Sequence, residues 1–150
     1  MPLYIFDQSE KVVTSATAVL ADGTTIFTIA GGPIVVLHLL SYCVTANDGT
    51  ASTLRWSHDP TDGAAATFSG VSASLASVAA GASLSLSMNT LSTVPTLSAN
   101  GPNLPISGNG AGIIMLMPGI ITTTIATGPS TGTWRHHLRY APMADGVSVT

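Results

Sequence analysis

The chain has 150 residues, and a domain of this length buries roughly 68 to 70% of the surface that its unfolded chain exposes. It therefore needs no disulfide or metal to hold one compact core. Charged residues make up 7% and hydrophobic residues 45% of the sequence, against roughly 25% charged in ordinary soluble domains. The hydrophobic content excludes a disordered chain. With four Lys and Arg residues in total, the chain also lacks the cations that a protein needs to bind nucleic acid through phosphates.

The scarcity of charge also bears on association. A monomer with so few surface charges is poorly protected against binding its own copies. The economical interpretation is that copies of the chain or a partner cover much of its surface. We therefore expect a component of an assembly, with copies of itself as partners in a trimer or ring.

Compartment and membrane signals are few. Cys43 is the only cysteine, which excludes an internal disulfide and a cysteine-based zinc site. Residues 1–10 have no basic n-region and no long apolar stretch, so we expect an N-terminal arm, no signal peptide, and synthesis in a host cytoplasm. The most apolar window, Ile29 to Ala46, contains Gly31-Gly32-Pro33 and His38. These residues argue against a membrane span.

The first half of the chain has the pattern of strands and turns. Its apolar stretches are rich in β-branched residues and alternate with Ser or Thr, which is typical of strands. Asp22-Gly23 suits a type I′ turn and predicts a hairpin between Lys11–Ala21 and Thr24–Ala30. Ile34–Val44 is apolar on both alternating faces for most of its length. We expect it to be a central strand or to lie beneath a neighbouring subunit.

The middle of the chain is more polar. Ser52–Ser57 predicts a strand that ends in a loop over residues 58–63. Ser72–Val78 is compatible with a single helical turn, and Ala82–Met88 alternates as a strand with one solvent-facing side. Residues 89–112 are rich in Pro, Gly and Asn, and a loop of that length is usually functional or docked on something.

The last part returns to strands. The expected ranges are Ile113–Met117, Ile120–Thr127, Thr133–Tyr140 and Val147–Val149. About seven to nine short strands separated by turns predict a single antiparallel all-β domain, built as a β-sandwich, a jelly-roll-like fold or a short barrel.

The motifs of catalysis and of metal binding are missing from the sequence. Most carboxylates lie near Gly or Pro, where turn formation explains them, and no Gly-x-Ser-x-Gly elbow occurs. Asp59 and Asp62 lack the third acidic ligand and the spacing of a calcium loop. Ser107–Gly112 opens no helix and is therefore no phosphate cradle. We expect a protein that is not an enzyme and that holds no cofactor and no metal.

Alternation along Thr133–Tyr140 assigns side chains to two faces of one strand. Trp134, Leu138 and Tyr140 share an apolar face and are the predicted core residues. His136 lies on the same face, and we interpret it, like other buried polar groups, as a hydrogen-bonded residue at the core margin. We interpret His38, within its apolar strand, in the same way.

The opposite face carries Arg135, His137 and Arg139, which we name the cationic stripe. Because neighbouring residues of a strand point to opposite faces, His136 and His137 do not hold one metal ion together. Two cations on one side of one strand make the stripe a candidate contact for an acidic patch on a partner. A solvated strand face is the alternative.

Two stretches at the ends of the domain have a further pattern. Residues 25–36 read Thr-Ile-Phe-Thr-Ile-Ala-Gly-Gly-Pro-Ile-Val-Val, and residues 132–147 carry a Trp strand followed by Tyr-Ala-Pro-Met-Ala-Asp-Gly-Val. Both resemble the opening and ending of small structural proteins of tailed bacteriophages. The resemblance implies a β-rich virion protein that decorates and stabilises the capsid by repeated protein contacts. Its implied partner is the major capsid protein, and its implied place is the capsid surface.

Three alternatives stay open. A neck or tail protein would have the same composition. A receptor-binding or carbohydrate-binding sandwich would use Trp56, Tyr42 or Tyr4 as a stacking platform, which exposed aromatics would favour and buried ones oppose. A hydrolytic enzyme would need a perturbed acid or base in a pocket.

Overall fold

The computed structural model describes residues 10–86, 96–98, 114–129 and 131–150, and these residues form strands without any helix. The strands are β1 (Lys11–Thr14), β2 (Thr24–Ala30), β3 (Ile34–Thr45), β4 (Thr53–Pro60), β5 (Ala66–Thr67), β6 (Ser83–Leu86), β7 (Thr96–Ser98), β8 (Ile114–Leu116), β9 (Gly119–Ala126), β10 (Thr133–Pro142) and β11 (Ser148–Val149). The predicted all-β class is confirmed. Apart from Glu10, the predicted arm lies outside the described residues, as does the predicted loop over 89–112 apart from β7.

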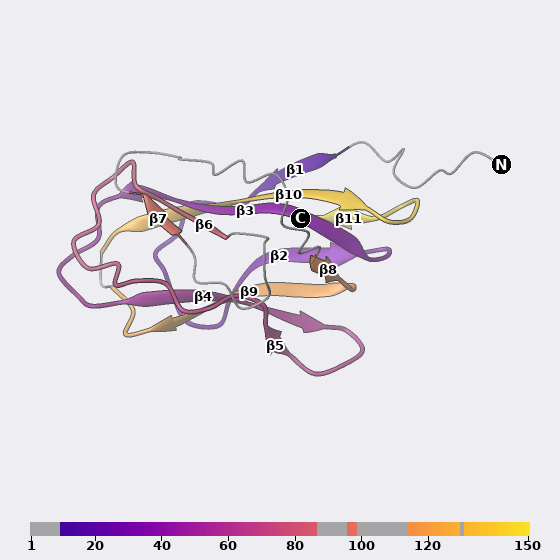
Figure 1. Ribbon diagram of the computed structural model, residues 1–150, viewed down its shortest axis with the longest axis horizontal. Coiled ribbons are helices and arrows are strands. Elements are labelled where there is room, and N and C mark those ends of the chain that lie inside the picture. Colours follow the sequence, from indigo (N-terminus) through magenta and orange to yellow (C-terminus); the bar gives the residue numbers. More distant parts are fainter. Residues whose placement is uncertain (1–9, 87–95, 99–113, 130) are drawn as a thin grey trace.

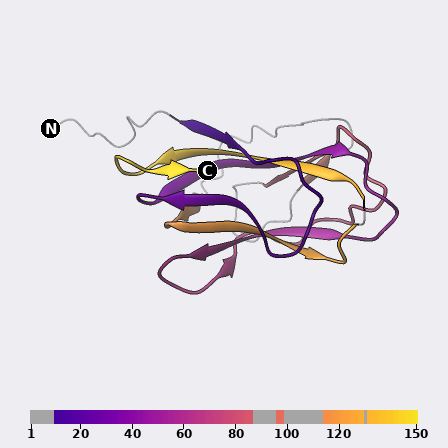
Figure 2. The same cartoon turned by 180° about the vertical axis from the view of Figure 1, so that it is seen from behind.

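Two antiparallel sheets lie one above the other as a sandwich (Figure 1). The six-stranded sheet has the order β1-β10-β3-β6-β7, and β8 also pairs with β3. The five-stranded sheet has the order β11-β2-β9-β4-β5. Figure 2 shows from behind that the β1–β2 connection passes from one layer to the other. Strand β3 pairs with β10 on one side and with β6 and β8 on the other, which confirms its predicted central position.

The predicted hairpin around Asp22-Gly23 is wrong. Strand β1 pairs with β10, whereas β2 pairs with β9 and β11 in the other sheet. The Asp22-Gly23 turn instead attaches the connection between β1 and β2 to β9. The Gly23 amide donates to the Thr123 carbonyl at 2.9 Å, and Asp22 Oδ1 accepts from the Ile125 amide at 2.9 Å. An Asp-Gly pair predicts a local reversal, but nothing local decides which strand pairs with which.

One predicted boundary and one predicted face also need correction. Strand β4 continues beyond Ser57 to Pro60, because its pairing with β9 extends to Gly119. All four residues of β6 are buried, including Ser83 and Ser85 on the side predicted to face solvent. Strand β6 lies inside its sheet, between β3 and β7, which contributes to this burial.

Residues 68–75 run along the edge of β4 in place of the predicted helical turn. Ser69 Oγ accepts from the Trp56 amide at 2.8 Å, and Ser72 Oγ accepts from the Leu54 amide at 3.0 Å. The amides of Phe68 and Ser72 donate back to the carbonyls of Trp56 and Leu54. Serine hydroxyls and backbone groups thus satisfy an edge that would otherwise be free to pair with another chain.

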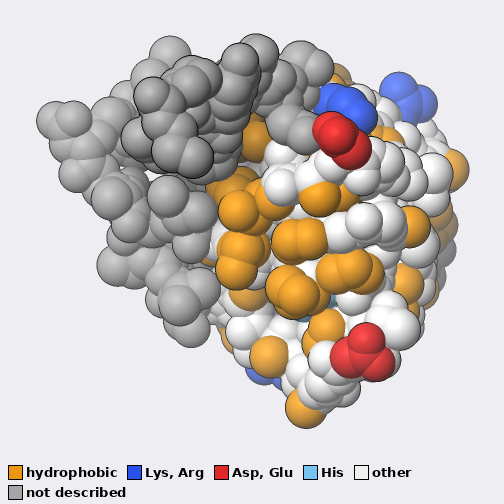
Figure 3. All heavy atoms as spheres, turned by 90° about the vertical axis from the view of Figure 1, so that its right-hand side faces the viewer, with side chains coloured by type: hydrophobic (Ala, Val, Ile, Leu, Met, Phe, Trp, Pro, Cys, Tyr) orange, Lys and Arg blue, Asp and Glu red, His pale blue; other side chains and the backbone are white. Residues whose placement is uncertain are grey.

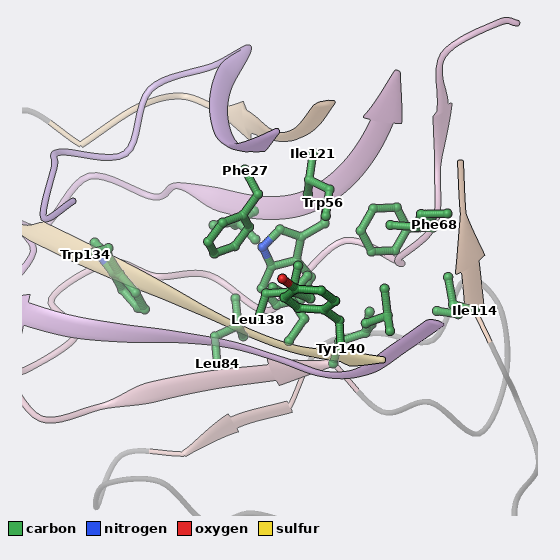
Figure 4. Packing of buried hydrophobic residues seen from close by; sticks show 14 of the residues in the cluster. Phe27, Trp56, Phe68, Leu84, Ile114, Ile121, Trp134, Leu138 and Tyr140 are labelled. Atoms are coloured by element: carbon green, nitrogen blue, oxygen red, sulfur yellow. The ribbon is translucent and has the colours of Figure 1, made fainter. Parts of the chain in front are cut away.

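The core lies between the sheets, where side chains from both layers interleave (Figure 4). Phe27, Trp56 and Ile121 of the five-stranded sheet point toward Trp134, Leu138 and Tyr140 of the six-stranded sheet. Trp134 is completely buried, and its Nε1 donates to Asn47 Oδ1 at 2.9 Å. Asn47 Nδ2 in turn donates to the Leu75 carbonyl at 2.9 Å. The indole therefore buries its apolar rings without leaving its polar atom unpaired.

Candidate docking surface

The inner side of β10 faces the core. Trp134 and Leu138 are 0% exposed, and Tyr140 is 3% exposed. Every second side chain of a strand points to the same face of its sheet, and on this face of β10 the other sheet covers the side chains. Strand β10 also has a neighbouring strand on each side. The three residues assigned to the core from the sequence therefore lie in it.

The outer side of β10 carries the cationic stripe. Arg135 and Arg139 are exposed and His137 is half-buried. Burial lowers the pKa of His137, and the neighbouring Arg135 guanidinium lowers it further. His137 is therefore mostly neutral at pH 7, so the positive charge of the stripe comes from the two arginines.

Arg139 already has an acidic partner within the chain. Its guanidinium forms an ion pair with Glu10 Oε2, and both side chains are about half exposed. Exposed ion pairs of this kind contribute about 0 to 1 kcal/mol. The pair leaves less of the Arg139 charge for a separate acidic partner.

The other two members of the stripe bind hydroxyl groups of the segment that includes β1. Arg135 donates from Nε and Nη2 to Thr17 Oγ1 at 3.0 and 2.8 Å. His137 Nδ1 lies 3.0 Å from Thr14 Oγ1. The stripe therefore helps to hold this segment against β10, a structural role that the sequence pattern did not reveal. Arg135 keeps its full charge, since a hydroxyl does not neutralise it.

A shallow depression of about 370 Å³ lies beside the stripe on the outer face of the six-stranded sheet. It is lined by Leu40, Tyr42 and Val44 of β3 and by Arg135 and His137 of β10, and we call it the β3–β10 depression. Register explains the grouping, because Arg135 pairs with Tyr42 and His137 with Leu40. The depression combines an apolar floor, one aromatic ring and one cation.

On the inner side of the same two strands, Ser41 and His136 form a hydrogen-bonded pair. Ser41 Oγ lies 2.6 Å from His136 Nδ1. Ser41 is 0% exposed and His136 is 5% exposed. Burial lowers the pKa of His136 to about 4, with a smaller effect from His137. The imidazole is therefore neutral at pH 7, and the serine hydroxyl is sealed from any dissolved substrate.

His136 also borders a cavity of about 130 Å³ beneath the β1–β2 connection, with Ser15 and Thr123 in its walls. The interpretation of His136 as a hydrogen-bonded core histidine fits this surrounding. The same interpretation of His38 does not hold. His38 is only half-buried, and within the described part of the chain its Nε2 is enclosed without a hydrogen-bond partner.

The aromatic residues proposed as a stacking platform are unevenly placed. Trp56 is completely buried. Tyr42 is half-buried in the β3–β10 depression. Tyr4 lies outside the described residues. Burial of Trp56 opposes the carbohydrate-binding alternative, and of the two candidate rings that the structure describes only Tyr42 still favours it.

Residues able to hold a metal do not gather in the part of the chain that the structure describes. No group of three or more His, Cys, Asp or Glu side chains meets there in a metal-binding arrangement. Asp59 is the second-last residue of β4 and pairs with Ile120, and Asp62 follows in the loop before β5.

The fold and this face define a β-sandwich with a mixed apolar and cationic surface on one sheet. No known protein family, curated protein or solved structure matches this chain. Across the described residues, no helix is long and apolar enough to cross a membrane.

Proposed function

We propose that this chain is a non-enzymatic structural protein that acts through repeated protein–protein contacts. In line with the sequence resemblance, its role is to decorate and stabilise a bacteriophage capsid. The observation that supports this proposal most directly is the β3–β10 depression, which places Tyr42 and Arg135 beside an apolar floor on a paired sheet.

The chemistry of the depression suits a protein partner. Tyr and Arg are enriched in interfaces, where they often act as energetic anchors. Leu40 and Val44 add apolar surface beside them. Both strands of this face are held in paired ladders, so little ordering cost accompanies binding. Many copies on a lattice would multiply a modest affinity through avidity.

Charge indicates the kind of partner. Arg135 keeps its charge, whereas Arg139 is paired with Glu10. An acidic patch on the major capsid protein would therefore interact chiefly with Arg135. This assignment refines the sequence-based expectation, which treated the two arginines alike.

The test is the occupancy of capsids by wild type and variants across a salt series. Arg135→Gln should lower occupancy and make it less sensitive to salt, because a charge-assisted contact is lost. Arg139→Gln should have a smaller effect, and the double variant should resemble Arg135→Gln. Arg55→Gln removes a cation from the outer face of the other sheet and is the matched control.

Equal occupancy of wild type and Arg135→Gln at every salt concentration would contradict the proposed contact. Electron microscopy of particles with and without the protein distinguishes the capsid surface from the neck or tail. Extra density on the head lattice is expected. Density confined to the neck or tail would contradict capsid decoration and favour the alternative location.

A further inference from the structure

The cavity of about 130 Å³ beneath the β1–β2 connection lies between the two sheets. Each sheet contributes one buried polar residue to its wall, His136 of β10 and Thr123 of β9. The connection, which passes from one layer to the other (Figure 2), supplies much of the remaining wall. Ala16 and Val19 of this connection are exposed, and the cavity reaches the surface beside them.

The hydrogen bond between Ser41 and His136 determines which ring nitrogen carries the hydrogen. Ser41 is completely buried, and within the described residues its hydroxyl has Nδ1 of His136 as its partner. A buried hydroxyl hydrogen needs an acceptor, so Ser41 donates to Nδ1. Burial lowers the pKa of His136 to about 4, so the ring is neutral at pH 7. The one hydrogen of the neutral imidazole is therefore on Nε2.

Nε2 of His136 has no hydrogen-bond partner in the part of the chain that the structure describes, because the side chain bonds through Nδ1 alone. The enclosed polar atoms without a partner belong to His38, Ser52 and Trp56, so Nε2 of His136 keeps contact with open space. The residue as a whole is only 5% exposed, and the open space that it borders is the cavity. Nε2 therefore directs an N–H donor into the cavity.

The opposite wall provides an acceptor. Thr123 Oγ1 donates its hydrogen to the Ala21 carbonyl at 3.2 Å and keeps lone pairs that can accept. Leu20 and Ile26 add apolar surface between the two polar groups and the connection. None of the described wall residues carries a full charge at pH 7.

These walls limit the chemistry of a ligand. A charged molecule would lose its hydration without meeting an opposite charge, which is costly. A hydroxyl group can accept from the His136 donor and donate to the Thr123 acceptor, since it has both capacities. A cavity of about 150 Å³ holds a benzene molecule. The slightly smaller volume here accommodates an apolar body of about six carbon atoms or fewer.

We propose that this cavity binds a small neutral alcohol or phenol. The ligand hydroxyl accepts from His136 Nε2 and donates to Thr123 Oγ1, and the apolar body packs against Leu20 and Ile26. This site goes beyond the proposed structural function and does not depend on it. It is also separate from the β3–β10 depression, which lies on the outer side of the six-stranded sheet.

NMR titration of the full chain with phenol at pH 7 tests the proposal. Phenol should bind with a dissociation constant of about 1 mM or lower. Toluene replaces the hydroxyl with a methyl group of similar size and is the matched ligand. It should bind about tenfold more weakly, because it leaves the His136 donor unpaired. Nitrogen spectra of the ring should show the hydrogen on Nε2 before phenol is added, and a hydrogen on Nδ1 would contradict the proposal.

Apolar surface exposed elsewhere is the main source of unspecific binding. Figure 3 shows hydrophobic side chains gathered across one end of the molecule, and Met115 is 54% exposed. Met115→Gln should therefore leave the phenol affinity unchanged. Thr123→Val removes the acceptor and should weaken phenol binding about threefold or more. Thr122→Val changes the opposite face of β9 and is the control.

His136→Phe keeps an aromatic ring but removes the donor, so phenol and toluene should then bind equally. Thermal unfolding verifies the fold of each variant, and the comparison of Thr123→Val with Thr122→Val decides the question if His136→Phe does not fold. Arg135→Gln, which tests capsid attachment, should leave phenol binding unchanged, so the two proposals fail separately. Three results would overturn the proposal: no saturable binding of phenol, equal affinity of wild type for toluene, or equal effects of the two threonine variants. The first would show that the cavity holds water alone.

Discussion

Ser41 Oγ lies 2.6 Å from Nδ1 of His136, on neighbouring strands and inside the layer between the two sheets. Neither residue reaches solvent to any useful extent. A serine and a histidine at this distance suggest a nucleophile and its base, but here the contact satisfies two buried polar groups. Its main consequence concerns the stability of the protein in acid.

His136 should make folding stability depend on pH. Burial lowers its pKa from 6.5 to about 4 in the folded protein. Between these values the unfolded chain binds more protons, so the free energy of unfolding falls as the pH drops from 6.5 toward 4. Once the pH is well below 4, this pKa shift should have lowered the free energy of unfolding by about 3 kcal/mol relative to neutral pH. Urea unfolding at a series of pH values measures it.

Two variants isolate this effect from other acid-sensitive groups. His136→Asn keeps a polar atom near Ser41 but does not titrate, so the stability difference between it and wild type should shrink as the pH falls. Ser41→Ala keeps the imidazole and should retain the acid sensitivity while losing about 1 to 3 kcal/mol. A constant difference between wild type and His136→Asn across the pH range would refute the assignment.

Trp134 should be among the most sensitive residues of the core. Trp134→Ala should cost about 3 to 5 kcal/mol, because it leaves a large cavity between the sheets. Trp134→Phe keeps most of the apolar ring surface but leaves Asn47 Oδ1 without its donor. This unpaired acceptor should lower the free energy of unfolding by about 1 to 3 kcal/mol, in addition to the loss from the smaller ring. Chemical denaturation compares the two. A cost below 1 kcal/mol for Trp134→Ala would contradict its place in the core.

The serines along the β4 edge should contribute through their hydroxyl groups. Ser72→Ala removes the acceptor of the Leu54 amide, and Ser69→Ala that of the Trp56 amide. Each should destabilise the protein by about 1 to 3 kcal/mol, because a buried donor is left unpaired. Ser74→Ala is the control, since its contact with the Ala76 amide is exposed. Hydrogen exchange of the Leu54 and Trp56 amides should accelerate in the first two variants only.

Gly31 should not tolerate a side chain. Its φ is +82°, and a Cβ there would collide with the carbonyl oxygen of Gly146. Gly81 has a similar φ of +91° but open space around it, so Gly81→Ala should cost only the backbone strain of about 1 to 2 kcal/mol. Gly31→Ala should cost clearly more, measured by thermal unfolding. Equal costs would show that the β10–β11 turn moves aside freely.

The expectations that held depend on local pattern. Alternation in Thr133–Tyr140 identified which side chains of β10 are buried, because the two faces of a strand follow directly from backbone geometry. The central position of β3 followed from the apolar run Ile34–Val44. The hairpin at Asp22-Gly23 failed for the opposite reason, since the pairing of β1 with β10 joins residues more than a hundred positions apart.

The sequence by itself determined the all-β class, most strand positions and the two faces of β10, because these depend on side-chain order along one strand. Only the tertiary structure decided which strands became neighbours. That choice paired Arg139 with Glu10 and buried Ser41 against His136. Strand pairing depends on the packing of the whole core, so no short stretch of sequence specifies it.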